Sequence, residues 1–268
     1  MPCLLYQRVA RRCAASSAAA LFTVLACPAM ADTTPVQDGA SPAAQPDYTL
    51  VPNIGVASQY RYRGLMQSAG YPAVSGGLDF THKSGFYLGN WDSTIRWLGN
   101  SNGQISAPVE TDFYGGYKNS INSDWSYDLG VLRYQYFGNY PSGTVSPNTT
   151  ELYGALTYKS LTFKYSYATS NLFGATNSQH SQYFDLSDNY DTGVWGLTVN
   201  SHIGYQFVRN VAAGSYLDWK LGVTKDMGQG WSAALAYVQT NARHTVYTSP
   251  QGQYMGGAAV IASITKTF

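Results

Sequence analysis

The stretch Asn53–Gly64, NIGVASQYRYRG, alternates in character with a period of two residues. Apolar and aromatic residues, from Ile54 to Tyr62, fall on one face, while small or polar residues and the arginines Arg61 and Arg63 fall on the other. Such alternation is typical of a strand in a soluble sandwich, and equally of a strand in a membrane barrel with a wet lumen. The remaining residues must decide between the two.

The first 31 residues have the layout of a Sec-type secretory signal peptide. Arg8, Arg11 and Arg12 precede the apolar run Ala14–Cys27, and Ala29-Met30-Ala31 forms a small-x-small cleavage site. All three cysteines of the chain lie within this segment, so residues 32–268 contain no disulfide framework. Residues 32–47 are rich in Pro, Ala and Asp without periodicity, which predicts a disordered lead-in. Residues 48–268 are then left to form the folded domain.

The composition excludes several classes of protein. Of 16 basic residues three lie in the signal segment, which leaves 13 against 15 acidic residues and a net charge of about −2. The sequence has no basic patch, so a nucleic-acid partner is not predicted. Beyond the signal, no run of 18 apolar residues is present, so a helical membrane span is not predicted. Charged residues make up only 12% of the chain, about half of what soluble domains usually carry.

Twelve alternating segments follow one another, separated by turn residues, with no convincing helix between them. We predict strands at about 53–65, 71–83, 85–97, 108–118, 125–137, 149–159, 161–170, 180–189, 193–207, 215–225, 230–240 and 254–268. Most connections alternate between short turns, such as Lys159-Ser160, and longer polar loops, such as Asn241–Gln253; the first, Met66–Gly70, is short. Short turns at one end and long loops at the other are typical of outer-membrane barrels. The sequence therefore predicts an all-β fold, a transmembrane antiparallel up-and-down β-barrel of about 12 strands.

The charges fall mainly on the polar face of these strands, which a membrane barrel turns toward its lumen. Arg133 and Lys266 are the exceptions, and we expect Arg133 to lie at a bulge or at the outer rim. Arg61 and Arg63 are expected to point into the lumen toward Asp79 or Asp92. The candidate pore-lining residues are Arg61, Arg63, Asp79, Asp92, Arg96, Glu110, Asp112, Lys164, His202 and Lys220.

The sequence offers no catalytic, cofactor or metal motif. It contains no GxGxxG, P-loop, HExxH or paired-cysteine pattern, and its four histidines have no ligand spacing. Ser201 and His202 are adjacent in a predicted strand, so they point to opposite faces and cannot share a proton. We therefore predict a protein that is not an enzyme and holds no cofactor or metal.

One set of motifs lies mainly within residues 53–97. It consists of Ser58–Gly64 with Gln67, Pro72-Ala73-Val74, Gly76–Phe80, Ser84–Tyr87, Gly89-Asn90-Trp91 and Ser93. These motifs resemble the TorF family of porin-like outer-membrane proteins, also called the Gcw_chp family. Gln59 stands where we expect an acidic residue of that family, and Met66 where we expect a small polar one. The resemblance implies an outer-membrane β-barrel, a channel whose solute is undefined, and no catalytic residues.

The sequence thus predicts a porin-like channel in the bacterial outer membrane that passes small polar or charged solutes through a narrow, charge-lined lumen. Expected partners are outer-membrane lipid and lipopolysaccharide, the solute, and the barrel-assembly machinery, which would read the C-terminal strand ending at Phe268. The alternatives are a closed barrel serving structure or surface interaction and, third, an outer-membrane hydrolase. Arg61 and Arg63 either brace the barrel through salt bridges or form a filter for anions or zwitterions.

Overall fold

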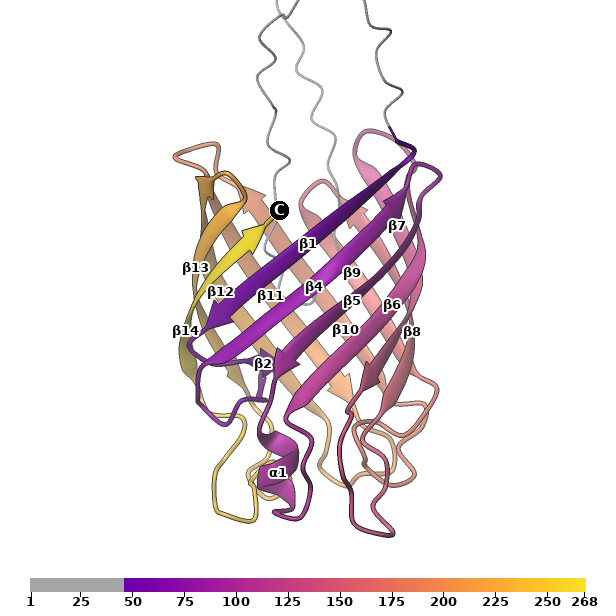
Figure 1. Ribbon diagram of the computed structural model, residues 1–268, viewed down its shortest axis with the longest axis vertical. Helices are drawn as coiled ribbons and strands as arrows, with labels where there is room; N and C mark the ends of the chain where they lie inside the picture. The colour runs from indigo at the N-terminus through magenta and orange to yellow at the C-terminus, as the bar shows by residue number, and fades with distance from the viewer. Residues whose placement is uncertain (1–45) are drawn as a thin grey trace, which may run out of the picture.

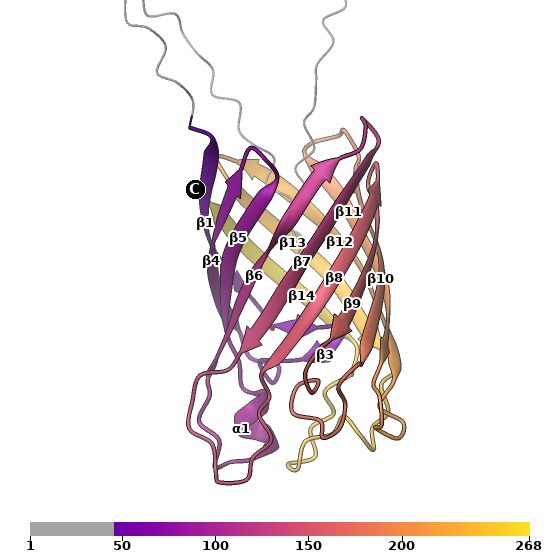
Figure 2. The same cartoon turned by 90° about the vertical axis from the view of Figure 1, so that its right-hand side faces the viewer.

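Twelve strands pair in sequence order and close into one antiparallel barrel (Figures 1 and 2). The computed structural model describes residues 46–268, so the predicted signal peptide and nearly all of the predicted lead-in lie outside the described residues. The fold class predicted from sequence is confirmed. The barrel strands are β1 (Tyr48–Ala57), β4 (Ala73–His82), β5 (Phe86–Thr94), β6 (Val109–Ser120), β7 (Trp125–Gln135), β8 (Thr149–Tyr158), β9 (Leu161–Ala168), β10 (Gln182–Asp191), β11 (Leu197–Phe207), β12 (Tyr216–Gly228), β13 (Trp231–Thr240) and β14 (Ala259–Thr267).

The barrel closes where its first and last strands meet. β1 pairs with β14 on one side, from Asn53 opposite Thr267 to Ala57 opposite Ser263, and with β4 on the other. Beyond the ladder, the Phe268 amide donates to the carbonyl of Pro52 at 3.0 Å. Every barrel strand of the described residues therefore has a neighbour on both sides, and this closure reduces the open edge that favours aggregation.

The connections are sorted by length between the two ends of the barrel. Short turns at 83–85, 121–124, 159–160, 192–196 and 229–230 lie at the end that also holds both chain ends of the barrel (Figure 1). The other end carries 58–72, 95–108, 136–148, 169–181, 208–215 and 241–258, with helix α1 (Trp97–Ser101) in the second of these. Within residues 46–268, no helix has the length and apolar character needed to cross a membrane.

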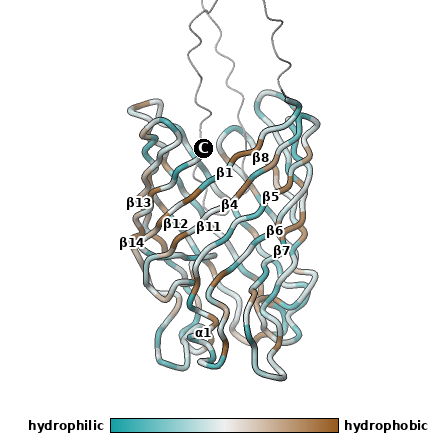
Figure 3. The backbone as a smooth tube through the Cα atoms, viewed as in Figure 1, coloured by the Kyte–Doolittle hydropathy of each residue, from teal (hydrophilic) through white to brown (hydrophobic). Residues whose placement is uncertain are grey.

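The outer face of the barrel is apolar around most of its circumference. Large side chains such as Leu88, Leu221 and Val260 are each more than 60% exposed there, and brown segments alternate with teal ones along the strands in Figure 3. Exposed apolar area of this extent is what a barrel presents to lipid hydrocarbon, and a water-soluble barrel would not carry it.

The predicted first strand is corrected by the structure. β1 ends at Ala57, and the chain then turns into the barrel, where β2 (Arg61–Tyr62) and β3 (Leu65–Met66) form a small inner hairpin. Arg63 and Gly64 have φ values of 46° and 75°, as a two-residue I′ turn requires. Tyr60 and Tyr62 thus point into the interior and not, as their alternation predicted, outward.

Position 64 requires a glycine, because this turn closely approaches the barrel wall formed by β12 and β13. A Cβ at this position would lie 2.7 Å from Cβ of Asp218 and 3.0 Å from Cβ of Thr240, on strands β12 and β13. Any other residue would meet that clash as well as the unfavourable positive φ. The inner hairpin therefore reaches across the lumen to β12 and β13.

Strand β5 corrects the predicted orientation of Asp92. Trp91 points inward, because its ring packs against Tyr60 of the inner hairpin with centroids 5.3 Å apart. Asp92 must then point outward, where its carboxylate accepts a hydrogen bond from Thr111 Oγ1 at 2.6 Å. Arg133 also points outward, near the loop end of β7, and its guanidinium donates to Thr150. The register of β7 is regular, so Arg133 lies at the rim and not at a bulge.

Candidate functional site

The inner hairpin is fastened to the barrel wall by Arg63. Its guanidinium donates to both carboxylate oxygens of Glu151 on β8, at 2.9 and 2.7 Å, and to Gln206 Oε1 on β11 at 2.7 Å. The ring of Tyr183 lies 4.0 Å from the guanidinium carbon. Because the Arg63 and Glu151 side chains are only 6% and 3% exposed, a fork of this geometry holds the hairpin firmly.

Tyrosine hydroxyls provide a second attachment of the inner hairpin. Tyr60, fully enclosed, donates to one oxygen of Glu110 on β6 at 2.7 Å, and Tyr136 donates to the other at 2.9 Å. The hydroxyl of Tyr62 bonds to that of Tyr134 on β7. Together with Arg63, these contacts tie the hairpin to strands β6, β7, β8 and β11. The segment Tyr60–Gly64 therefore crosses the lumen.

Arg61 is also held, but by backbone and amide groups. Its guanidinium donates to the carbonyl oxygens of Gly64 and Gly257 and, through Nε, to Gln59. The predicted contacts of Arg61 and Arg63 with Asp79 or Asp92 are not formed in the described structure. Asp79 accepts instead from the Tyr114 hydroxyl at 2.6 Å.

A cavity of about 170 Å³ lies beside the inner hairpin within the barrel. One of its walls, formed by strands β13 and β14, is built from small uncharged side chains that include Ala234, Ala236 and Ser263. The adjoining wall, from strands β9 to β12, carries the ionisable groups, and its strand β12 is hydrogen-bonded to β13. These groups are Lys164, Asp185, His202, Asp218 and Lys220, and Arg61 and Arg63 of the inner hairpin also line the cavity.

His202 links the two carboxylates of this wall. Its Nδ1 lies 2.5 Å from Asp185 Oδ2 and its Nε2 lies 2.7 Å from Asp218 Oδ1. The Tyr183 hydroxyl donates to Asp218 as well, at 3.0 Å. Ser201 is on the opposite face of β11, so it does not share a proton with His202, as the alternation of the strand predicted.

Lys164 and Lys220 stand apart from this network. Lys164, on β9, lies over the ring of Tyr153 at 3.9 Å, and Lys220 follows two residues after Asp218 on β12. Across residues 46–268, the salt bridges within 4.0 Å include neither of these lysines. The described part of the chain therefore leaves both ammonium groups available to a solute in the cavity.

The ten candidate residues are thus not all at one site. Five of them line the cavity: Arg61, Arg63, Lys164, His202 and Lys220. Asp79 and Glu110 point inward but are bonded to tyrosines, and Asp112 is fully buried with neither carboxylate oxygen hydrogen-bonded in the described structure. Asp92 faces outward, and Arg96 is exposed at the start of α1, stacked on Tyr71 at 4.4 Å.

Several functional groups were not singled out from sequence. Glu151, Asp185 and Asp218 lie at inward positions, which strand alternation predicts, but nothing in one sequence marks them as partners of Arg63 and His202. For Gln206 and Tyr183, strand alternation likewise predicts only that the side chain points inward, and it does not predict a role. Pairing across a lumen depends on strand register around the whole barrel, and alternation along one strand does not contain that information.

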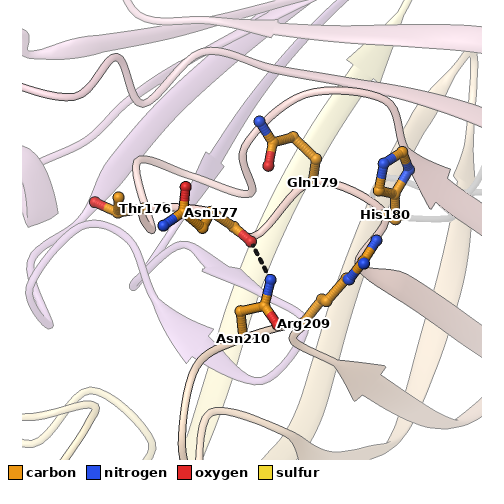
Figure 4. A pocket seen from close by; sticks show the side chains of 6 residues that line it. All are labelled: Thr176, Asn177, Gln179, His180, Arg209 and Asn210. Carbon is orange, nitrogen blue, oxygen red and sulfur yellow. Dashed lines mark hydrogen bonds between the residues drawn. The ribbon is translucent and has the colours of Figure 1, made fainter.

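The loop end of the barrel carries a second, open recess of about 380 Å³ (Figure 4). Asn210 donates to the carbonyl of Asn177 across it at 2.9 Å, and the side chains of His180 and Arg209 stand at one side. The six lining residues are all exposed, so this recess is a wet gap between loops 169–181 and 208–215. Nearby, burial raises the pKa of the Tyr247 phenol, whose hydroxyl donates to the Gly214 carbonyl.

No arrangement that would hold a metal occurs among residues 46–268, where three or more His, Cys, Asp or Glu side chains never converge suitably.

Comparison with known proteins places this geometry among barrels. The family described as "Bacterial protein of unknown function (Gcw_chp)" matches residues 40–268. That match confirms the Gcw_chp resemblance and leaves the name TorF a prediction. No curated protein matches the sequence.

Solved structures resemble the chain in fold. The KdgM porin matches with a TM-score of 0.50 and 9% identity, over 82% of this chain and 99% of that one. The COG4313 outer membrane channel from Pseudomonas putida F1 gives 0.49 and 10% identity, over 87% and 100%. The NanC porin gives 0.49 and 10%, over 81% and 99%. At such low identity, the KdgM match supports the barrel fold alone.

Proposed function

We propose a channel function for this chain, which belongs to the Gcw_chp family of bacterial proteins. It forms a porin-like, non-enzymatic barrel that passes small polar or charged solutes through a narrow lumen. The observation that carries this proposal is the combination of an apolar outer face with an interior cavity lined by ionisable side chains. The apolar outer face of such a barrel contacts lipid, and its polar interior is suited to admit small solutes from water.

The location follows from the same surfaces. We place the barrel in the bacterial outer membrane, with lipid and lipopolysaccharide against its outer face and the short turns toward the periplasm. The barrel-assembly machinery would recognise the final strand, whose Phe268 is 70% exposed next to the closing seam. The fold that this chain shares with a solved porin agrees with this location.

A closed structural or surface-interaction barrel is the second candidate, and one observation favours it. The inner hairpin spans the lumen and is fastened by the buried Arg63–Glu151 pair and by the Tyr60–Glu110 hydrogen bond. Such fastening narrows the passage between the loop end and the cavity. The same contacts indicate that Arg63 acts as a brace and does not filter ions, because Glu151 and Gln206 occupy its donors.

Single-channel recording on the refolded barrel, residues 32–268, tests the proposal. We expect small conductance steps from the natural barrel and larger steps when residues 59–71 are replaced by a Gly-Ser segment of equal length. The matched control replaces residues 139–146, in a loop on the same rim, and should leave the conductance unchanged. A natural barrel without steps above background would overturn the channel function, and conduction by the 59–71 replacement alone would establish the closed barrel.

A further inference from the structure

The lumen cavity has more cationic than anionic groups on its surface. Its lining includes Arg61, Arg63, Lys164 and Lys220, whereas the carboxylates in the lining are those of Asp185 and Asp218 only, within the described residues. Glu151, which neutralises Arg63, is not part of the lining. With Arg63 neutralised, three cations (Arg61, Lys164 and Lys220) still exceed the two carboxylates, so the cavity surface is positive even when the histidine is left out of the count.

The carboxylates of the cavity already have partners. Asp185 and Asp218 are joined through His202, at 2.5 and 2.7 Å, and Asp218 also accepts from Tyr183. Both acids are held in place by these bonds, so they are poorly placed to neutralise the lysines completely. The ammonium groups of Lys164 and Lys220 keep hydrogen-bond donors for another acceptor, since a lysine has three and no acceptor of its own.

The wall next to Lys220 is suited to the apolar part of a small molecule, because Lys220 pairs with Val238 across the β12–β13 ladder. Ala234, Ala236 and Val238 of β13 and Ile261 of β14 line the cavity with short aliphatic side chains. A ligand in this space can therefore contact the ammonium groups of β9 and β12 and, next to them, the methyl groups of β13 and β14. An organic anion of a few carbon atoms has that distribution of polarity, whereas an inorganic ion or a sugar does not.

We propose that this cavity is a binding site for a small organic carboxylate, with Lys164 and Lys220 as the residues that bind its oxygens and the alanines of β13 as the surface against its hydrocarbon part. The inference rests on the proposed function in one respect, since a channel must admit the solute to the lumen. The site also defines a solute class for that channel. Lysine acts there as a compact charge that attracts the carboxylate, so binding weakens as salt screens it.

Calorimetric titration of the refolded barrel in detergent with propionate tests the site, with propionamide as the neutral ligand of the same shape. We expect binding of propionate, at least tenfold weaker binding of propionamide, and loss of propionate affinity at high salt. Lys164→Gln and Lys220→Gln should each weaken propionate binding about tenfold, the effect of losing one hydrogen bond to a charged group. Ala236→Leu should also weaken it, by filling the apolar side.

The matched control is Lys118→Gln, an inward lysine on β6 that lies over Tyr87 and does not line the cavity. It should bind propionate as the natural barrel does. Equal binding of propionate and propionamide to the natural barrel, or no binding of either, would contradict the proposed carboxylate site. Conductance without propionate binding would remove this inference and keep the channel, whereas propionate binding without conductance would remove the channel and keep the site.

Discussion

Arg63 is the residue on which the interior arrangement depends. It adopts a positive φ, which a side chain with a Cβ takes up at some cost, and it carries a charge into the barrel. The Glu151 carboxylate, Gln206 and the Tyr183 ring offset both costs. A buried pair of this kind adds little net stability compared with apolar residues, but it strongly penalises the loss of either member alone.

We therefore expect Glu151→Gln to destabilise the barrel by about 3–5 kcal/mol, because it leaves Arg63 charged and unpaired within the lumen. Arg63→Gln should have a similar effect, and the double variant should cost less than the two single costs together. Arg133→Gln, which removes a guanidinium from the outer rim, is the control. Urea unfolding from lipid vesicles, followed by tryptophan fluorescence, measures these differences. Additive single costs would show that the two side chains are not coupled.

Arg61 and Lys220 should differ in their effect on ion preference. Arg61 is bonded to two carbonyl oxygens, whereas Lys220 has no salt bridge in the described structure. In a KCl gradient, Lys220→Gln should shift the reversal potential toward cations, and Arg61→Gln should leave it nearly unchanged. A larger shift from Arg61→Gln would identify the arginine as the filter.

At the scale of elements, the barrel strands were predictable and the inner hairpin was not. Alternation and turn residues place eleven of the strands close to their observed positions, because lipid and lumen impose opposite demands on successive residues. The same alternation continues from Ala57 to Tyr62, so it cannot reveal that the chain leaves the wall. The Arg63-Gly64 turn is a weak signal of a hairpin, and the contacts that draw it inward come from β6, β8 and β11.

Asp92 shows the limit of assigning faces by charge. Tyr87 and Trp91 point inward on β5, so Asp92 points outward, on the same face as Asn90, whose side-chain amide donates to its carboxylate. Aromatic side chains point both outward and inward in this barrel, because the inner hairpin packs against aromatic rings in the interior. Sequence alternation gives the two faces of a strand, but the choice between them required Tyr60, a partner distant in sequence.

The apolar outer face should tolerate a new charge only near its edges. Leu221, in the middle of β12, is 61% exposed, and Leu217 lies at the loop end of the same strand. We expect Leu221→Arg to lower the free energy of unfolding in lipid vesicles by about 2–4 kcal/mol, and Leu217→Arg by about 1 kcal/mol or less. Equal small effects at both positions would contradict a lipid-facing surface.

At the scale of the whole molecule, the sorting of loops by length predicts the orientation of the barrel in the membrane. The long connections share one end, and the short turns and chain ends share the other (Figure 2). Residues 46–268 contain no cysteine, so single cysteines report position without interference. Ser142, in loop 136–148, and Ser123, in turn 121–124, are both exposed and lie at opposite ends.

We expect a membrane-impermeant maleimide to label Ser142→Cys on intact Gram-negative cells and to label Ser123→Cys only after the outer membrane is permeabilised. In outer-membrane barrels the long loops are extracellular and the short turns face the periplasm. The two variants differ only in which end bears the thiol, so each controls for the expression and reactivity of the other. Labelling of Ser123→Cys alone on intact cells would reverse the orientation, and labelling of both would contradict a barrel that spans the membrane.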